Sequence, residues 1–354
     1  MYKLFCTIVF TLSFSVASAQ ELASDPTISP DVWNLPFNQI AQVACHNCFE
    51  HTFTPERGSF KTVLNDVKTI ELDLWDQKGI FFGGEPKKWF VRHSIGSVFT
   101  SGNDNSCTGD GRGTNDLRAC LEDVKQWSDD HPGHFPITVI LDKKQGWSYM
   151  PGSDRKPKDL DDLVRDVFKE ALFTPADLFG DRDITFFQRQ NATADTLQSR
   201  VKDRGWPNAD DLRGRVLAVL NGGDVLDIGC PDCVMYQYLK ERGLDGVIFA
   251  APPLLTKEEV NGKSDKPNSQ FIVMNNIAAA HKELSKNVFN ENHIGRVWGN
   301  DDDDFSAQIK RKTNIAVYDK YQAQTVDSYR VVPLNWEVSI GFQKSPSIRP
   351  SPFK

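Results

Sequence analysis

Short apolar segments alternate with amphipathic helical segments along most of the chain, and this alternation constrains the fold more than any other feature. Between several of the segments, apolar residues recur at helical spacing, as over 117–127 and 160–171. Strands that alternate with helices are typical of parallel βα units. The chain therefore predicts an α/β fold with strands over 39–46, 68–75, 89–93, 136–142, 215–220, 246–250, 271–275, 295–298 and 314–318.

The number of candidate strands exceeds by one what an eight-stranded α/β barrel needs. We expect either 89–93 or 295–298 to be irregular or peripheral. Periodicity alone also permits a doubly wound parallel sheet.

The N-terminus has the pattern of a secretory signal peptide. Lys3 precedes an apolar run over 4–16, and Ala17-Ser18-Ala19 is a small-residue cleavage site. The apolar run is shorter than the about 20 residues that a membrane span needs. We therefore expect cleavage after Ala19 and a secreted protein, whose remaining length suits one α/β barrel or two ordinary domains. Asn191-Ala192-Thr193 is a sequon, so Asn191 is a candidate glycosylation site on a surface loop.

The charge of the chain is mildly acidic. The formal net charge of −7 becomes −8 when Lys3 leaves with the signal peptide, and no block of basic residues is present. Nucleic-acid binding and broad electrostatic docking on anionic membranes both need such a block, so the composition argues against these two functions.

Of the seven cysteines, only Cys6 lies in the signal peptide. An even number in an exported chain favours disulfides over a redox dithiol or a zinc site. The two CxxC motifs also lack a thioredoxin-like context. We expect the pairs that are nearest in sequence, namely Cys45–Cys48, Cys107–Cys120 and Cys230–Cys233.

Polar side chains gather at the C-terminal ends of the predicted strands, which is the edge that holds the active site in a parallel barrel. Because residues two apart on a strand point to the same face, Glu71 and Asp73 lie side by side. Each such residue alone is more often structural, and it is their joint placement that favours a site. The residues are His46, Asn47, Glu71, Asp73, His93 and Asp142.

The ligand types in this set favour a hard cation. Two carboxylates inside the apolar segment "TIELDLW" are costly to bury without a cation between them. The oxygen ligands Asn47, Glu71, Asp73 and Asp142 suit Ca²⁺ or Mg²⁺ rather than zinc. His46 and His93 then remain for proton transfer near neutral pH, with His51 a minor alternative to His46.

Four motifs carry a family resemblance: "HN" at 46–47, "ELDLWD" at 71–76, "VRHS" at 91–94 and "PITVILDKK" at 136–144. They resemble the catalytic half of the calcium-dependent phosphoinositide phospholipase C superfamily, and most of all its small secreted branch. The resemblance is firm over 40–180 and returns at "RVWGNDDDDF" (296–305) and "IAVYDKY" (315–321). It implies an irregular TIM barrel over 20–342, preceded by the signal peptide 1–19 and followed by a flexible tail over 343–354.

The resemblance also implies roles for the residues. Asn47, Glu71, Asp73 and Asp142 would hold Ca²⁺, with Mg²⁺ as the alternative ion. His46 would hydrogen-bond the phosphoryl oxygens, and His93 would be the general acid. The attacking group would be the inositol 2-hydroxyl of the substrate, with Glu71 or His46 as its base. Lys144 would contact phosphate, and Lys143 is nearly as plausible for that contact.

The chain departs from the family pattern at three places. Asp142 stands where a longer Glu is common, and cysteines flank His46 and Asn47. The insertion "QKGIFFGGEPKKWF" adds Phe81, Phe82, Trp89 and Phe90, which would either dip into a membrane, frame the pocket or pack in the barrel.

These features favour a secreted, calcium-dependent phosphodiesterase of phospholipase C type that acts on inositol phospholipids or related glycolipids. We expect a monomer that contacts a membrane surface transiently. A glycerophosphodiester phosphodiesterase or phospholipase D-like lipase on the same fold is the second hypothesis. A secreted barrel that binds a lipid or glycan without catalysis is the third.

Overall fold

The computed structural model describes residues 25–50, 60–76, 86–92, 107, 116–149, 155–180, 196–222, 233–299 and 301–336. Several predictions fall outside these residues, namely the signal peptide 1–19, the tail 343–354, and the residues His51, Phe81, Phe82, His93, Asn191 and Cys230. Within the described part of the chain, no helix is long and apolar enough to cross a membrane.

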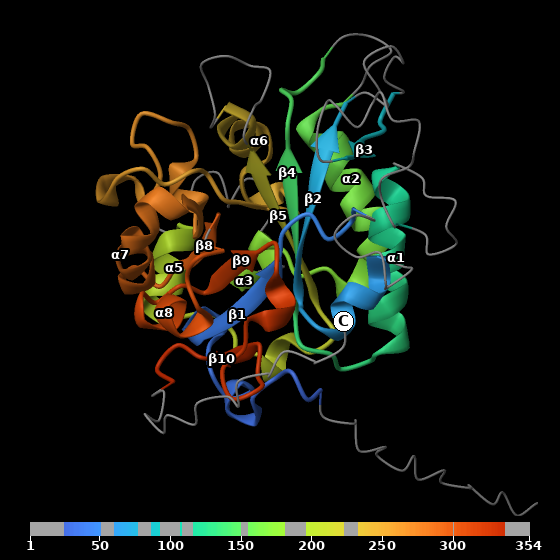
Figure 1. Cartoon of the computed structure of the whole chain (residues 1–354). Coiled ribbons are helices and arrows are strands. Elements are labelled where there is room, and N and C mark those ends of the chain that lie inside the picture. Colours follow the sequence, from blue (N-terminus) through green and yellow to red (C-terminus); the bar gives the residue numbers. More distant parts are fainter. Residues whose placement is uncertain are drawn as a thin grey trace, which may run out of the picture.

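Eight parallel strands follow one another in the order β6-β5-β4-β2-β1-β9-β8-β7 (Figure 1). A parallel bridge between Pro253 and Asn276 links the two ends of this series, so the barrel is nearly closed. The strands are β1 (Ile40–Cys45), β2 (Thr69–Trp75), β4 (Ile137–Lys143), β5 (Val216–Gly222), β6 (Phe249–Ala250), β7 (Met274–Ala278), β8 (Ile294–Trp298) and β9 (Ile315–Tyr318).

The extra strand candidate is peripheral, as predicted. The segment 89–93 contributes only β3 (Phe90–Val91), which pairs antiparallel with β2 outside the parallel series. The segment 295–298 belongs instead to the barrel strand β8. A further short strand that the sequence did not predict, β10 (Val331–Pro333), pairs antiparallel with β1. The barrel is confirmed, and the doubly wound alternative is wrong.

Helices surround the barrel, as Figure 1 shows. The α-helices are α1 (Leu117–Asp130), α2 (Pro157–Phe168), α3 (Pro175–Phe179), α5 (Leu197–Arg204), α6 (Cys233–Arg242), α7 (Ser285–Asn290) and α8 (Phe305–Lys310). Short 3-10 helices lie at Pro30–Val32, Phe37–Gln39, Phe60–Asn65, Lys169–Ala171, Asp210–Leu212, Gly243–Asp245, Lys257–Glu259, Ser269–Phe271, Ala279–Leu284 and Tyr321–Ala323.

Local sequence explains where these helices begin. Asp116 caps α1 by accepting a hydrogen bond from the backbone N–H of Arg118. Pro157 occupies the first position of α2, where its missing N–H costs nothing. Asp304 caps α8, so part of the acidic run 301–304 serves a helix N-terminus.

The period-2 alternation of the strands divides the core into two layers. Val139 and Leu141 of β4 pack with Leu160 and Val164 of α2, between barrel and helices. Ile140 belongs to a second cluster together with apolar residues of β5, β6, β8 and β9, inside the barrel. Glu71 is in register with Ile140, so Glu71 points into the barrel as well.

Two aromatic residues of the insertion after β2 are core residues. Trp89 has no exposed surface and Phe90 is 4% exposed. Barrel packing is therefore the correct interpretation for these two side chains, and membrane contact through them is wrong.

Candidate active site

Three carboxylates meet inside the barrel at the C-terminal edge of β2 and β4. Asp73 lies in register with Asp142, and Glu71 lies two residues before Asp73 on the same face of β2. One oxygen from each of the three carboxylates lies within 4.8 Å of the others, and all three residues are buried. We call Glu71, Asp73 and Asp142 the acidic cluster.

A lysine partly offsets the repulsion within the acidic cluster. Nζ of Lys144 lies 3.2 Å from Oδ1 of Asp73 and also contacts Asp142. Burial raises the pKa of Asp73 well above its usual value; Lys144 opposes this rise, while the charges of Asp142 and Glu71 add to it. Burial by itself lowers the pKa of Lys144, but the charges of Asp142 and Asp73 outweigh it and raise the pKa. The cluster thus has an unmet demand for positive charge.

An arginine from the opposite side of the barrel holds Glu71. Arg296 of β8 is 4% exposed; its Nη2 contacts Oε2 of Glu71, and its Nη1 donates to Oδ1 of Asn276 at 2.6 Å. Burial favours the neutral form of Glu71, yet the charges of Arg296 and His46 lower its pKa. Glu71 is therefore held as a carboxylate.

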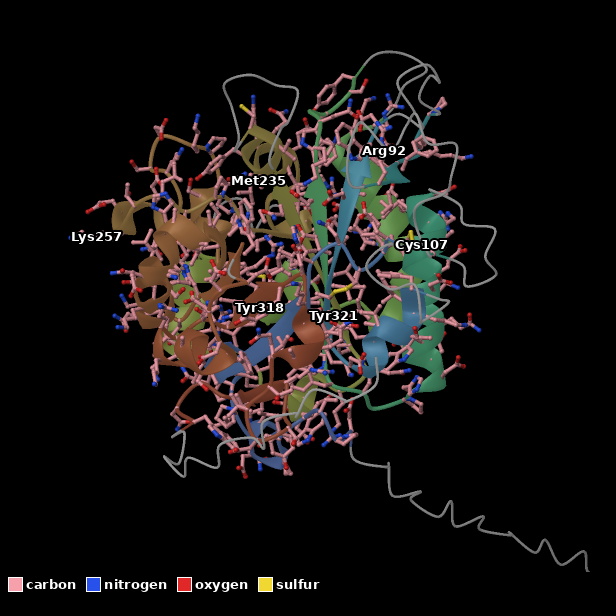
Figure 2. All side chains as sticks on the ribbon, viewed as in Figure 1. Arg92, Cys107, Met235, Lys257, Tyr318 and Tyr321 are labelled. Atoms are coloured by element: carbon pink, nitrogen blue, oxygen red, sulfur yellow. A yellow bond between two sulfur atoms is a disulfide. The ribbon has the colours of Figure 1, made fainter. Side chains whose placement is uncertain are left out.

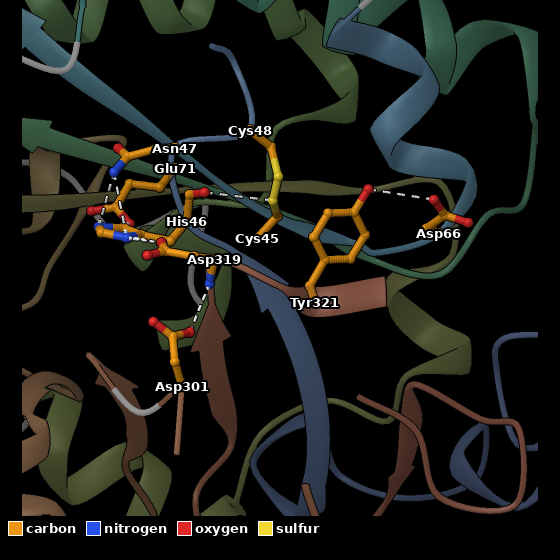
Figure 3. Close-up of a disulfide and its surroundings, with 9 residues drawn as sticks. All are labelled: Cys45, His46, Asn47, Cys48, Asp66, Glu71, Asp301, Asp319 and Tyr321. Carbon is orange, nitrogen blue, oxygen red and sulfur yellow. Dashed lines mark hydrogen bonds and ion pairs between the residues drawn. A yellow bond between two sulfur atoms is a disulfide. The ribbon is translucent and has the colours of Figure 1, made fainter. Parts of the chain in front are cut away.

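His46 follows β1 and connects the acidic cluster with β9. Its Nδ1 lies 2.6 Å from Oδ1 of Asp319, and its Nε2 lies 3.7 Å from Oε2 of Glu71 (Figure 3). The side chain is 26% exposed, so one face of the ring reaches the barrel mouth. Asp319 is itself held by its backbone N–H, which donates to Asp301 at 3.0 Å.

Asn47 presents a buried acceptor that has no partner among the described residues. The residue is 2% exposed, and its Oδ1 accepts no hydrogen bond from the described part of the chain. Figure 3 shows the side chain beside Glu71 and His46. An orphaned amide oxygen on a side chain beside Glu71, which is one of three crowded carboxylates, completes a donor set of the kind that a hard cation such as Ca²⁺ binds, so the residues fit this ion.

Asn221, next to the last residue of β5, presents a similar orphaned acceptor. It lies in register with Asp142, it is 2% exposed, and its Oδ1 lacks a partner among the described residues. It therefore faces the same end of the barrel as the acidic cluster.

The structure brings most of the predicted site residues together, namely His46, Asn47, Glu71, Asp73, Asp142 and Lys144. Lys143 points to the other face of β4, where its Nζ lies 3.0 Å from Oδ1 of Asp76 and the side chain is fully buried. Of the two lysines, only Lys144 reaches the acidic cluster, so the geometry favours Lys144 over Lys143 for the phosphate contact.

Sequence reasoning missed Arg296, Asn276, Asp319 and Asn221. All four lie in or directly after barrel strands β8, β7, β9 and β5. The strand-end rule that selected the acidic cluster, applied to the later predicted strands, would have marked Asn221, Asn276 and Asp319 as candidates, but not their partners. It would not have marked Arg296, which lies in the middle of β8.

Two of the predicted disulfides are present, Cys45–Cys48 and Cys107–Cys120. Cys107 lies beside α1 (Figure 2). Cys233 is disulfide-bonded as well, and its predicted partner Cys230 lies outside the described residues. The CxxC motif at Cys45–Cys48 is therefore neither a free dithiol nor a zinc site.

A parallel α/β barrel with an oxygen-only acidic cluster and a histidine at its C-terminal edge defines a metal-dependent TIM-barrel enzyme. The family model for Ca²⁺-dependent phosphoinositide phospholipase C matches residues 111–297. The chain belongs to this family, whose members are phosphoric diester hydrolases that depend on Ca²⁺.

Solved structures agree with the family assignment. The calcium-dependent phosphoinositol-specific phospholipase C of a Gram-negative Pseudomonas species, described as an apo form and myoinositol complex, is 44% identical. The match covers 88% of this chain and 99% of the other, with a TM-score of 0.75. The Ca²⁺-dependent enzyme of Streptomyces antibioticus shares the fold at 22% identity, covering 84% and 98% of the two chains, with a TM-score of 0.65. No curated protein matches the chain.

Proposed function

We propose that the chain is an exported phospholipase C that cleaves inositol phospholipids or related glycolipids at the barrel mouth. One observation carries the proposal. Asn47, whose Oδ1 is orphaned, and Glu71 of the buried acidic cluster both lie beside a half-buried histidine, His46, at the edge where barrel enzymes bind their substrates.

The four oxygen side chains would hold Ca²⁺. When bound, the ion supplies positive charge to the phosphoryl oxygens and to the developing alkoxide. The residues around it have separate tasks. Arg296 keeps Glu71 ionised as a ligand, and Lys144 neutralises the acidic cluster on the β4 side.

The chemistry follows from the substrate. The inositol 2-hydroxyl attacks phosphorus, the bond to the diacylglycerol oxygen breaks, and a cyclic inositol phosphodiester forms. The proton of the 2-hydroxyl passes either to His46, which Asp319 orients, or to Glu71; where Glu71 takes it, His46 donates a hydrogen bond to the phosphoryl oxygens. His93 is proposed from its motif alone as the acid that protonates the leaving diacylglycerol oxygen.

The test is turnover on a panel of phosphodiesters, namely phosphatidylinositol, its phosphorylated forms and glycerophosphoinositol, with chelator and with Ca²⁺ or Mg²⁺ restored. We expect diacylglycerol and cyclic inositol phosphate from phosphatidylinositol only with Ca²⁺, and a loss of about 10²-fold or more in His93→Ala. Cleavage on the other side of phosphorus would indicate the phospholipase D-like alternative. Ca²⁺ binding without turnover on any substrate would indicate a non-catalytic barrel.

A membrane surface is the proposed setting. The large apolar side chains that are exposed in the described part of the chain are Tyr149, Leu255 and Trp298, at 46%, 49% and 38%. They follow β4 and β6 and end β8, so all three lie toward the C-terminal edge of the barrel. Alanine at the three positions should weaken sedimentation with phosphatidylinositol vesicles and spare turnover of a soluble inositol phosphodiester.

Export, a monomeric state and one barrel domain over 20–342 complete the proposal. The disulfides of the described residues support an oxidising compartment. The mass of the exported protein should be that of a chain that starts at Gln20. Light scattering should give the mass of one chain per particle. Removal of 343–354 should leave turnover unchanged.

A further inference from the structure

The Cys45–Cys48 disulfide encloses two of the site residues. Cys45 is the last residue of β1, and it is in register with Ile70 on one side and Tyr318 on the other, so the strand holds it in place. His46 and Asn47 are the only residues between the two cysteines, as Figure 3 shows. Both cysteines are 1% exposed and belong to the main core cluster.

The backbone inside this ring is unusual. Asn47 has a φ of 53°, in the left-handed region, which asparagine adopts more readily than most residues with a Cβ. Its carbonyl accepts a hydrogen bond from Glu50 N–H at 3.0 Å, and His46 N–H donates to Tyr318 O at 3.2 Å. These bonds fix the turn, but within the described residues nothing donates to Oδ1 of Asn47. Nδ2 of the same amide lies 3.4 Å from both ring nitrogens of His46, the other residue that the disulfide encloses, so the position of the Asn47 side chain depends on this short ring of backbone.

Loop length argues that this disulfide acts locally. In the chain-entropy account, a disulfide stabilises a fold more when it closes a longer loop. Cys45 and Cys48 are separated by 3 positions, and Cys107 and Cys120 by 13. The shorter bridge therefore contributes less to global stability by this route, while it constrains both residues that it encloses.

We propose that the Cys45–Cys48 disulfide is a positioning element that sets the affinity of the site for Ca²⁺ through Asn47. The bridge holds the left-handed turn, and the turn places the Asn47 amide beside His46 and Glu71, where its orphaned Oδ1 would bind the ion. The inference rests on the proposed function, because it takes Asn47 as a ligand of the ion. The activity thus depends on an oxidised CxxC motif that itself does no redox chemistry.

The experiment compares calorimetric Ca²⁺ titrations of the full-length exported protein, without substrate. The variants are the double substitution C45A/C48A, the ligand substitution Asn47→Ala, and C107A/C120A as the matched disulfide control. We expect C45A/C48A to raise the Kd for Ca²⁺ by about 10- to 100-fold, as for other groups that orient ligands. C107A/C120A should lower the melting temperature at least as much and leave the Kd unchanged.

The outcomes distinguish the positioning role of the disulfide from the role of Asn47 as a ligand. If Asn47→Ala weakens Ca²⁺ binding while C45A/C48A binds as the wild type does, the positioning role is wrong and the ligand assignment stands. If Asn47→Ala has no effect on the Kd, the ligand assignment fails and the inference fails with it. An equal rise of the Kd in both disulfide variants would show a general loss of structure and overturn the inference.

A second measurement covers the case in which C45A/C48A does not fold. The wild type is partly reduced with a phosphine and alkylated, and mass spectrometry identifies the species opened only at Cys45–Cys48. That species should bind Ca²⁺ more weakly than the oxidised protein while its circular dichroism spectrum is retained. An unchanged Kd in the folded, opened species contradicts the inference.

Discussion

Nδ1 of His46 lies 2.6 Å from Oδ1 of Asp319, across 273 positions of sequence. The contact follows from the barrel, because β1 and β9 are adjacent and Cys45 is in register with Tyr318, so the next residue of each strand meets its counterpart. The carboxylate of Asp319 accepts a hydrogen bond from Nδ1–H, so Nε2, on the Glu71 side, faces the substrate. His46 is therefore held in one tautomer.

Asp319→Asn tests this role of Asp319. The amide cannot stabilise a protonated ring and can favour the wrong tautomer, so we expect kcat to fall by about 10²-fold. The Kd for Ca²⁺ should not change, since Asp319 is outside the acidic cluster. The measurement is kcat against pH together with Ca²⁺ calorimetry. Asp302→Asn, at an exposed position of the neighbouring loop, is the control, and equal losses in the two variants would contradict the role of Asp319.

Lys144→Met should destabilise the metal-free protein and strengthen its binding of Ca²⁺. Lys144 contacts Asp73 and Asp142, so without Ca²⁺ its removal leaves three buried carboxylates with less compensating charge. We expect a lower melting temperature in chelator and a smaller Kd for Ca²⁺, because the ammonium competes with the ion for the same oxygens. Lys158→Met, which removes an exposed pair with Asp162 on α2, should change neither quantity. A weaker affinity for Ca²⁺ in Lys144→Met would show that the lysine helps to build the ion site.

Asp73→Asn should stabilise the metal-free protein. The pKa of Asp73 is raised in the folded state, so the unfolded chain releases its proton first, and stability from this group is lost as pH rises above about 3.8. Near neutral pH the amide removes that cost, and the melting temperature in chelator should rise by about 2 °C or more.

The same variant should lose its response to calcium. At a Ca²⁺ concentration of about 100 Kd, ligand binding adds about 2.7 kcal/mol to wild-type stability, and Asp73→Asn should show almost none of this gain. Thermal melts with and without Ca²⁺ measure both effects. A lower melting temperature for Asp73→Asn in chelator would mean that the pairing with Lys144 outweighs the burial of the carboxylate.

The acidic cluster was predictable because its geometry depends only on local rules. Glu71 and Asp73 share a face by the period of a strand, and Asp142 lies near the end of the adjacent strand β4, so parallel register brings the three together. The same period places Lys143 and Lys144 on opposite faces. It could have distinguished the two lysines if the predicted strand had run through residue 143, as β4 does.

Arg296 and Asp319 were harder to predict. Their partners Glu71 and His46 are 225 and 273 positions away, and only closure of the barrel brings them together. The left-handed φ of Asn47 was not readable from the sequence either, because the strand, the turn and the disulfide jointly impose it. Local periodicity thus located the cluster, and tertiary pairing determined which groups tune it.

The buried His293 should make the protein sensitive to acid. It lies just before β8 and is 1% exposed, and burial lowers its pKa from 6.5 to about 4, against the opposing effect of a hydrogen bond with the backbone of Val260. Because the unfolded chain binds this proton first, the stability that the neutral ring contributes is complete above about pH 6.5 and is lost as pH falls towards 4. Over that window the loss amounts to about 3 kcal/mol.

His293→Gln keeps a hydrogen-bonding side chain without the titration, so its free energy of unfolding in urea should fall less steeply between these two pH values than that of the wild type. His131→Asn, at an exposed position, should keep the wild-type slope. Parallel pH profiles for wild type and His293→Gln would show that His293 does not remain neutral in the folded protein.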